Sequence, residues 1–183
     1  MRKIYLVIVM AFFAIVCSAQ INRVAKWEGG FYFGVTNPIG AFHNGDAKIG
    51  AMMGIDLRYN IQDSPWDFGA FIELCTAMRD FYKDGSYAYQ NNRTTVVGIV
   101  SHYNFGQGRQ VNPYIGLGLG FALNDVVGSR VYPSKHHSLA ISPRIGVELL
   151  RHLRVDCHTE ISRKGFHTIG LTLGLAFGGG KKK

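Results

Sequence analysis

The sequence predicts an all-β protein in which about eight antiparallel strands close into an up-and-down barrel that crosses a membrane. Three observations support this fold. Large apolar and small residues alternate, the connections are alternately long and short, and aromatic residues gather at one end of the strands. With 183 residues and 23 glycines, the chain suits a single domain built of strands and turns.

The alternation is clearest in the segments 166–177 and 114–124. From Thr168 and from Ile115 onward, leucine, isoleucine and phenylalanine occupy one parity, and glycine, alanine and threonine dominate the other. Only a pleated strand sends successive side chains to opposite faces. Large residues opposite small ones suit a strand whose apolar side chains meet lipid and whose small ones fit a narrow barrel. We therefore expect the leucines to face outward.

The same rule, applied to the whole chain, predicts eight strands. Their lengths are close to the roughly 9 to 11 residues that a tilted strand needs to cross a bilayer. The predicted strands are 27–35, 49–60, 66–78, 94–105, 114–124, 139–149, 153–162 and 166–177. Pro143 cannot donate a ladder hydrogen bond, so we expect a bulge or a weakened pairing there.

The predicted connections differ in length. The long ones are 36–48, 79–93 and 125–137, and the short ones are 61–65, 106–110, 150–152 and 163–165. Transmembrane barrels have short periplasmic turns and longer exterior loops. Apart from 163–165, the lengths alternate as this architecture requires, and we expect both chain ends on the periplasmic side.

Six aromatic residues fall at the strand ends next to the short turns. They are Trp27, Tyr59, Trp66, Tyr103, Phe105 and Phe177. Aromatic residues often occupy the core of soluble β proteins, but in transmembrane barrels they form girdles at the membrane interfaces. Six rings at one end favour a girdle.

The N-terminus has the pattern of a secretory signal peptide. Arg2 and Lys3 precede an apolar run, 4–16, which is too short to span a membrane as a helix and ends in small residues. Val16 disfavours lipid attachment at Cys17, because a small residue is expected there. The predicted organisation is a signal peptide at 1–19, a barrel at 20–177 and a basic tail at 178–183.

Two cysteines remain in the predicted mature chain. Cys75 falls on the inward row of its strand and Cys157 on the outward row. Thiols on opposite faces of a barrel wall cannot be bridged without breaking the strands, so we expect both to be free.

The apolar leader, the strand meander and the segments PYIGLGLGF (113–121) and GLTLGLAF (170–177) resemble the small outer-membrane β-barrel proteins, which include the OmpA transmembrane domain and OmpX-like barrels. The resemblance implies a Gram-negative cell outer membrane, contact with its lipid, and assembly by the barrel assembly machinery. It also implies that Phe177 is the aromatic residue that this machinery reads. The GGGKKK tail beyond Phe177 departs from the family pattern.

The inward row carries charges of both signs. They are Glu28, Asp56, Arg58, Asp67, Glu73, Arg144, Glu148, Arg154, Asp156 and Glu160, with His158 among them. Enclosed charges must pair or stay hydrated. A symmetric turn at Arg151 would place Glu148 opposite Arg154 and Arg144 opposite His158. We expect an ion network that plugs the lumen; the alternative is a narrow water-filled channel, which a barrel of this size disfavours.

An enzyme of the lipid A-modifying type would need a serine and a histidine together. Ser101 and His102 are neighbours on one strand and therefore point to opposite faces, and His158 with Glu160 lacks a serine. His136 and His137 form a polar loop pattern rather than a metal site. We expect no catalytic site, cofactor or metal.

The exterior loops are rich in cations and aromatic residues. They contain Lys83, Arg93, Arg130, Lys135, Lys164, Phe81, Tyr82, Tyr87, Tyr89 and Tyr132. These residues suit contact with lipopolysaccharide phosphates or with a surface protein partner, although a solvated surface would look the same. The net charge of +8 is not gathered into a nucleic-acid-binding motif. A soluble periplasmic barrel of lipocalin type, with the apolar row inside, is a further alternative.

Overall fold

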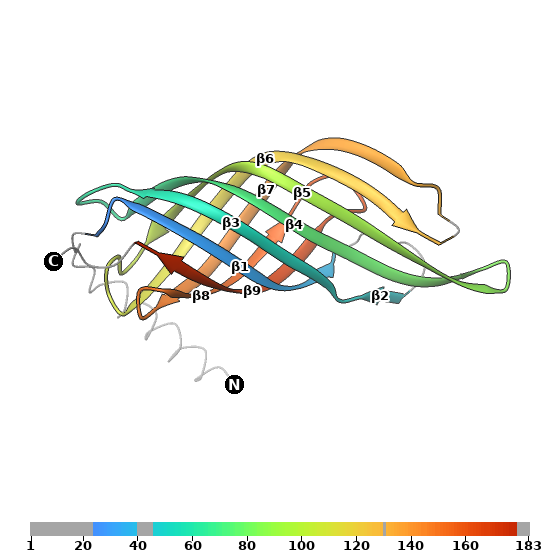
Figure 1. The fold of residues 1–183 in the computed structure, drawn as a ribbon, viewed down its shortest axis with the longest axis horizontal. Coiled ribbons are helices and arrows are strands. Elements are labelled where there is room, and N and C mark those ends of the chain that lie inside the picture. The colour runs from blue at the N-terminus through green and yellow to red at the C-terminus, as the bar shows by residue number, and fades with distance from the viewer. Residues whose placement is uncertain (1–23, 40–45, 130, 179–183) are drawn as a thin grey trace, which may run out of the picture.

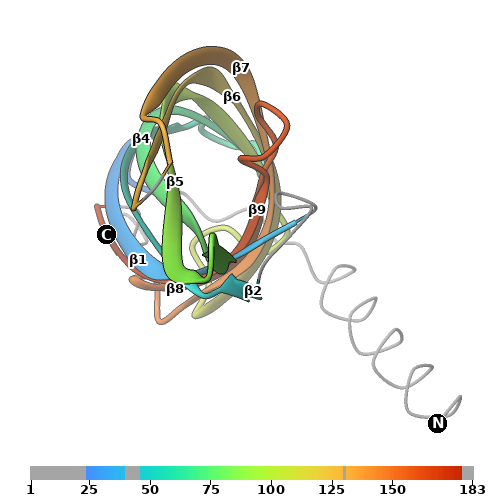
Figure 2. The same ribbon diagram turned by 90° about the vertical axis from the view of Figure 1, so that its right-hand side faces the viewer.

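The computed structural model describes residues 24–39, 46–129 and 131–178, which form one antiparallel sheet closed into a ring (Figures 1 and 2). The strands are β1 (Trp27–Pro38), β2 (Asp46–Lys48), β3 (Gly50–Asn60), β4 (Trp66–Lys83), β5 (Ser86–Asn104), β6 (Val111–Gly128), β7 (Ser134–Leu149), β8 (Leu153–Glu160) and β9 (Thr168–Phe177). Every strand except β2 pairs with its neighbours along the chain, and the pairing of β1 with β9 completes the ring. β2 pairs in antiparallel fashion with β4 at Met78, Arg79 and Asp80. The predicted up-and-down barrel of about eight strands is confirmed.

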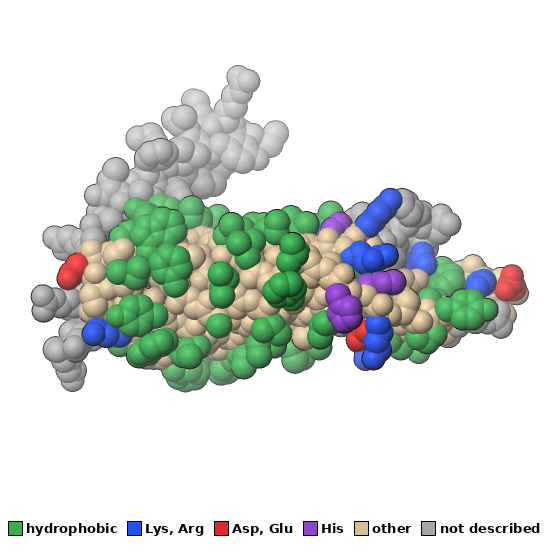
Figure 3. All heavy atoms as spheres, turned by 90° about the horizontal axis from the view of Figure 1, so that it is seen from above, with side chains coloured by type: hydrophobic (Ala, Val, Ile, Leu, Met, Phe, Trp, Pro, Cys, Tyr) green, Lys and Arg blue, Asp and Glu red, His purple; other side chains and the backbone are tan. Residues whose placement is uncertain are grey.

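The large apolar side chains face outward. In β9, Leu173 is 43% exposed and Thr172 is 2% exposed. In β5, Val97 is 51% exposed whereas its neighbour Val96 is fully buried. Figure 3 shows hydrophobic side chains over the body of the barrel on the face in view, and most of the charged side chains toward one end of it. The alternative of a soluble barrel with its apolar row inside is therefore wrong for the described strands.

Glycine on the inward row makes room for large lumen side chains. A Cβ atom at Gly54 would collide with the Tyr32 phenol, and one at Gly116 would collide with the His102 ring. The narrow lumen can hold these rings only because the facing positions on the adjacent strands have no side chain. The glycine pattern of the sequence is thus a packing requirement.

The prediction of a loop at 79–93 is wrong. β4 continues to Lys83 and β5 starts at Ser86, so this region is a β-hairpin that extends beyond the rest of the barrel (Figure 1). Asp84 and Gly85 form its two-residue turn, with φ angles of 51° and 72°. Two positive φ angles characterise the type I′ turn, for which Asp-Gly is a preferred sequence.

The other two long loops are also shorter than predicted. β6 runs to Gly128 and β7 begins at Ser134, so most of 125–137 is strand, including His136 and His137. β1 runs to Pro38, and β2 occupies the end of the predicted loop 36–48. Positions 40–45 and Arg130 lie outside the described residues, as do 1–23 and 179–183, which hold the predicted signal peptide and most of the basic tail.

Pro143 weakens one ladder without a bulge. Pro143 lies opposite Leu117 in an uninterrupted β6–β7 register. The β7–β8 ladder runs from Leu149 to Arg144, is interrupted at Pro143, and resumes in the same register with the Ile141–Ile161 bridge. The missing N–H of proline accounts for the interruption. The expected weakened pairing is confirmed, and the expected bulge is absent.

Cys75 is buried in the lumen and Cys157 lies on the outer surface, and both are free, as predicted from their parity. No helix in the described part of the chain is long and apolar enough to cross a membrane.

Candidate functional site

The half of the lumen nearer the short turns holds an ion network around Arg58, which is 2% exposed. Its Nη2 atom donates to Glu28 Oε1 at 2.6 Å, and its Nε atom lies 3.3 Å from Asp56 Oδ1. Nη1 lies 3.8 Å from Asp67 Oδ2. Asp67 also pairs with His102 Nδ1 at 2.8 Å. One guanidinium therefore links carboxylates from β1, β3 and β4.

Arg154 extends the same network from the opposite wall. Its Nη2 atom donates to Glu148 Oε2 at 3.0 Å, and its guanidinium also contacts Glu28 and Asp56. The β7–β8 register places Glu148 opposite Arg154, as the symmetric turn predicts. Nearby, the Tyr114 hydroxyl donates to Asp156.

Glu73 is the centre of a second cluster, which lies further from the short turns. The Tyr32 hydroxyl donates to Glu73 Oε2 at 2.6 Å, Arg144 Nη2 donates to the same oxygen at 3.2 Å, and His158 Nε2 lies 3.1 Å from it. The Arg144 guanidinium also lies over the Phe71 ring, 4.5 Å from its centroid. Four strands therefore meet at one carboxylate.

The predicted network residue Glu160 is buried in the lumen, but neither of its carboxylate oxygens has a hydrogen-bond partner among the described residues. Asp156 accepts from the Tyr114 hydroxyl, and the other predicted members belong either to the cluster around Arg58 and Arg154 or to the cluster around Glu73. His102, which was not among the predicted network residues, joins the Arg58 cluster through Asp67.

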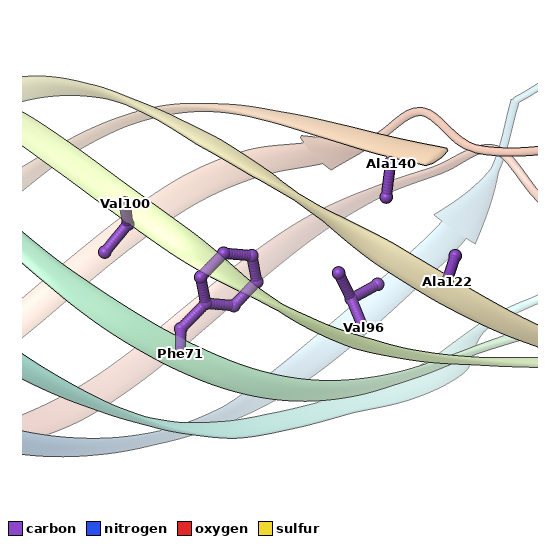
Figure 4. Close-up of a cluster of buried hydrophobic side chains, with 5 residues drawn as sticks. All are labelled: Phe71, Val96, Val100, Ala122 and Ala140. Carbon is purple, nitrogen blue, oxygen red and sulfur yellow. The ribbon is translucent and has the colours of Figure 1, made fainter. Parts of the chain in front are cut away.

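An apolar cluster lines one side of the lumen beside the Glu73 cluster. It consists of Phe71, Val96, Val100, Ala122 and Ala140, whose side chains are buried and point into the barrel from β4, β5, β6 and β7 (Figure 4). Such a cluster offers no polar partner for water. Val96 and Val100 share the parity of the inward residue His102, so the inward row of β5 carries apolar as well as polar side chains.

The short-turn end of the lumen is closed by amide side chains. Gln107 Nε2 donates to Asn60 Oδ1 at 3.0 Å, and Asn112 Nδ2 donates to Asn104 Oδ1 at 3.0 Å. Asn60 Nδ2 also donates to the carbonyl oxygen of Ala25 at 3.0 Å, which ties the segment before β1 to this end. The two contacts of Asn60 join residues 47 and 35 positions apart in the chain, and no local sequence signal indicated them.

Little space remains between these groups. A void of about 10 Å³ lies among Tyr32, His102, Tyr114, Arg144 and Arg154, with room for about one water molecule. Side chains therefore fill the lumen at the level of the ion clusters.

The six predicted girdle residues lie at the short-turn end of the barrel, and five of them form ring pairs with one another. The ring centroids are 5.2 Å apart for Trp27 and Tyr59, 5.1 Å for Trp66 and Tyr103, and 5.1 Å for Tyr103 and Phe105. Phe177 stacks on Phe31 at 6.0 Å. Trp27 and Trp66 lie opposite their tyrosine partners in the strand register. The rings thus form clusters that face outward.

The exterior hairpin of β4 and β5 carries tyrosines on its outward face. Tyr82 is 80% exposed and packs edge to face against Tyr87 at 6.2 Å. A hydrogen bond to the Asp80 carboxylate raises the pKa of the Tyr87 hydroxyl above its ordinary value. Lys48 of β2 pairs with Asp80 at 3.6 Å, so β2 braces the base of the hairpin. The result is an ordered projection.

Three charged residues lie side by side on the outer face of β5, β6 and β7, next to the last apolar row. The registers place Arg93 of β5 opposite Asp125 of β6, and Asp125 opposite Lys135 of β7. The preceding outward row contains Thr95, Leu123 and His137. Arg93 and Lys135 are exposed. Two cations therefore lie at the edge of the apolar band away from the short turns.

Ser101 and His102 do not meet as a nucleophile and a base. The Ser101 hydroxyl donates to the backbone carbonyl oxygen of Asp67 at 3.0 Å on the outer side, whereas His102 points into the lumen toward the Asp67 side chain. Within the described ranges, no three histidine, cysteine, aspartate or glutamate side chains are grouped so that they could hold a metal ion.

Known proteins share this architecture. The model of the outer membrane protein beta-barrel domain family matches residues 8–177. The chain is similar to neisserial surface protein A, with 15% identity, coverage of 85% of this chain and 98% of that chain, and a TM-score of 0.56. It is also similar to the N-terminal β-barrel domain of Pseudomonas aeruginosa OprF, with 14% identity, coverage of 85% and 100%, and a TM-score of 0.50. At these identities the structural likeness shows the fold alone. No curated protein sequence matches the chain.

Proposed function

The chain belongs to the outer membrane protein beta-barrel domain family, and from this premise we propose that it is a plugged barrel of the cell outer membrane that presents a rigid contact surface to the exterior. The observation that carries the proposal is the contrast between the lumen of the barrel and its hairpin end. Side chains fill the lumen, whereas the exterior end extends into an ordered hairpin with exposed tyrosines and nearby cations.

The proposal includes an orientation in the membrane. Residues 1–19 act as a cleavable export signal, and the barrel assembly machinery inserts the strands. The girdle of Trp27, Trp66 and their partners lies at the periplasmic interface, where amphipathic rings are favourable. The hairpin then projects from the cell surface.

The first expected contact is with lipopolysaccharide. Arg93 and Lys135 lie at the exterior edge of the apolar band, at the level where the phosphates of the outer leaflet would be. Each cation near an anionic membrane surface gains about 1 kcal/mol of electrostatic attraction. The second expected contact is a surface protein partner at Tyr82 and Tyr87, because exposed tyrosines are enriched at protein interfaces.

The filled lumen argues against the alternative of a narrow channel. The ion clusters and the apolar cluster around Phe71 leave no wide polar path between the strands. The separation of Ser101 and His102 likewise argues against lipid A modification. The proposed role is structural and interactive.

Removing two exterior cations tests the lipopolysaccharide contact. The double variant Arg93→Gln with Lys135→Gln is expected to bind immobilised lipopolysaccharide roughly thirtyfold more weakly, because two attractions of about 1 kcal/mol are lost. The matched control, Lys26→Gln with Arg151→Gln, changes the net charge equally at the periplasmic end and should leave binding unchanged. If both double variants lose affinity equally, the exterior row is not the contact.

A further inference from the structure

A hollow interrupts the outer surface of the barrel at Ser101. Ser101 lies between Phe68 of β4 and Leu117 of β6, the two residues opposite it in the strand registers. Its hydroxyl donates to the backbone carbonyl oxygen of Asp67 at 3.0 Å, so the short side chain lies against the sheet. The space left above it has a volume of about 630 Å³.

The walls of the hollow are apolar side chains. They are Phe68, Ile99, Ile115, Leu117 and Leu119. Trp66 and Tyr103 border it at the short-turn end, where their rings pack edge to face at 5.1 Å. Gly69, Val100 and Gly116 have inward parity, so they contribute mainly backbone to the floor. The hollow is an apolar trough, with Phe68 on one side, Leu117 on the other, and the rings of Trp66 and Tyr103 at one end.

The chemistry of this trough matches a hydrocarbon chain. The Ser101 hydroxyl already has a partner within the protein, so the floor presents no side-chain donor that a ligand must satisfy. The trough opens outward within the apolar band, which acyl chains surround in a membrane. A chain lying in it would contact protein at the floor and on both sides, and would therefore gain more dispersion energy than one on the surrounding convex surface.

We propose that the hollow at Ser101 is a binding site for an acyl chain of a phospholipid in the periplasmic leaflet. The leaflet follows from Trp66 and Tyr103, since the girdle lies at the periplasmic interface in the proposed function, on which this inference rests. The acyl chain runs along the trough past Ile99 and Leu117, and the glycerol end of the lipid lies near the two rings.

The sequence contains two tryptophans, which serve as matched reporters. Trp66 lines the hollow, whereas Trp27 belongs to the same girdle but packs against Tyr59 away from the lining. The variant Trp27→Phe leaves Trp66 as the reporter, and Trp66→Phe leaves Trp27. Each protein is titrated in detergent micelles with phosphatidylethanolamine whose brominated acyl chains quench tryptophan fluorescence on contact. Trp66 is expected to reach half quenching at an about tenfold lower lipid fraction than Trp27.

A filling substitution tests whether the hollow causes this difference. In the Trp66 reporter, Ser101→Phe should abolish the tenfold preference, whereas Thr95→Phe, which adds the same ring to the outward row of β5 outside the lining, should preserve it. Slower gel migration after boiling than before verifies that each variant is folded. Equal quenching of the two tryptophans, or a preference that survives Ser101→Phe, would overturn the proposal.

Two further outcomes separate the possible causes of failure. Loss of Trp66 quenching as the protein concentration rises would assign the hollow to a second copy of the chain and would overturn the lipid site. Failure of brominated lipid to quench either tryptophan after insertion into bilayers would refute the membrane orientation on which the inference rests.

Discussion

Glu73→Gln is expected to lower the free energy of unfolding by about 3 to 5 kcal/mol, the cost of leaving a buried charge without its partner. The substitution keeps the shape of the side chain but removes the negative charge that faces Arg144 and His158. Arg144 would keep its charge in a site that is almost fully buried and filled by neighbouring side chains. Urea unfolding in detergent micelles measures the loss.

The matched control is Asp84→Asn at the tip of the exterior hairpin. It is the same carboxylate-to-amide change, and asparagine tolerates the φ angle of 51° at this position. We expect a change within about 0.5 kcal/mol, as for other surface substitutions. Equal stability of the Glu73→Gln variant and the wild type would show that the cluster is hydrated and that the lumen is not plugged there.

Leu119→Arg should destabilise the protein in bilayers by about 2 to 4 kcal/mol, because an arginine at mid-depth on the lipid face must leave water. Leu119 is the middle of five outward apolar residues of β6 that run from Ile115 to Leu123, and it is 47% exposed. Unfolding by urea from phospholipid vesicles provides the measurement.

Leu123→Arg is the control for depth. Leu123 has the same residue type, strand and exposed fraction, 47%, but it lies opposite Thr95 and His137 at the edge of the apolar band. Near the interface the expected cost falls to about 0 to 1 kcal/mol. Equal costs at the two positions would mean that Leu119 is not within the hydrocarbon region, and the proposed depth of β6 would be wrong.

The sequence was sufficient to predict the faces of the strands. β9 shows why: alternation has a period of two residues, and a pleated strand converts it directly into an inner and an outer row. The exposures of Leu173 and Thr172 follow this rule without any knowledge of the neighbouring strands. Counting the alternating segments likewise gives the eight strands that close the ring, but not the short strand β2, which lies in a predicted loop.

The exterior hairpin was missed because polar composition was interpreted as a loop. Residues 79–93 lack the apolar row that marks the membrane-spanning segments, since this part of the barrel faces water on its outer side. The dipeptide Asp84–Gly85 between tyrosine-rich flanks was the available signal for a two-residue turn.

The contacts of the lumen required the three-dimensional structure. Parity shows that Glu73 points inward, but not that it meets Tyr32 of β1 and Arg144 of β7. These partners come from strands that are not adjacent to β4, so the contact depends on how the closed barrel staggers its strands. By contrast, the pair Glu148 and Arg154 lies on one hairpin, and its register follows from the turn.

Val96 and Val97 allow the most direct test of the central claim, that large apolar side chains outside meet lipid while side chains fill the lumen. They are adjacent residues of one type, fully buried and 51% exposed respectively. Methyl nuclear Overhauser effects are measured on deuterated, methyl-labelled protein in protonated lipid. We expect Val97 methyl groups to show contacts with acyl chains, and Val96 methyl groups to show contacts with neither acyl chains nor water. Contacts of Val96 with water or lipid, or of Val97 with water alone, would contradict the account.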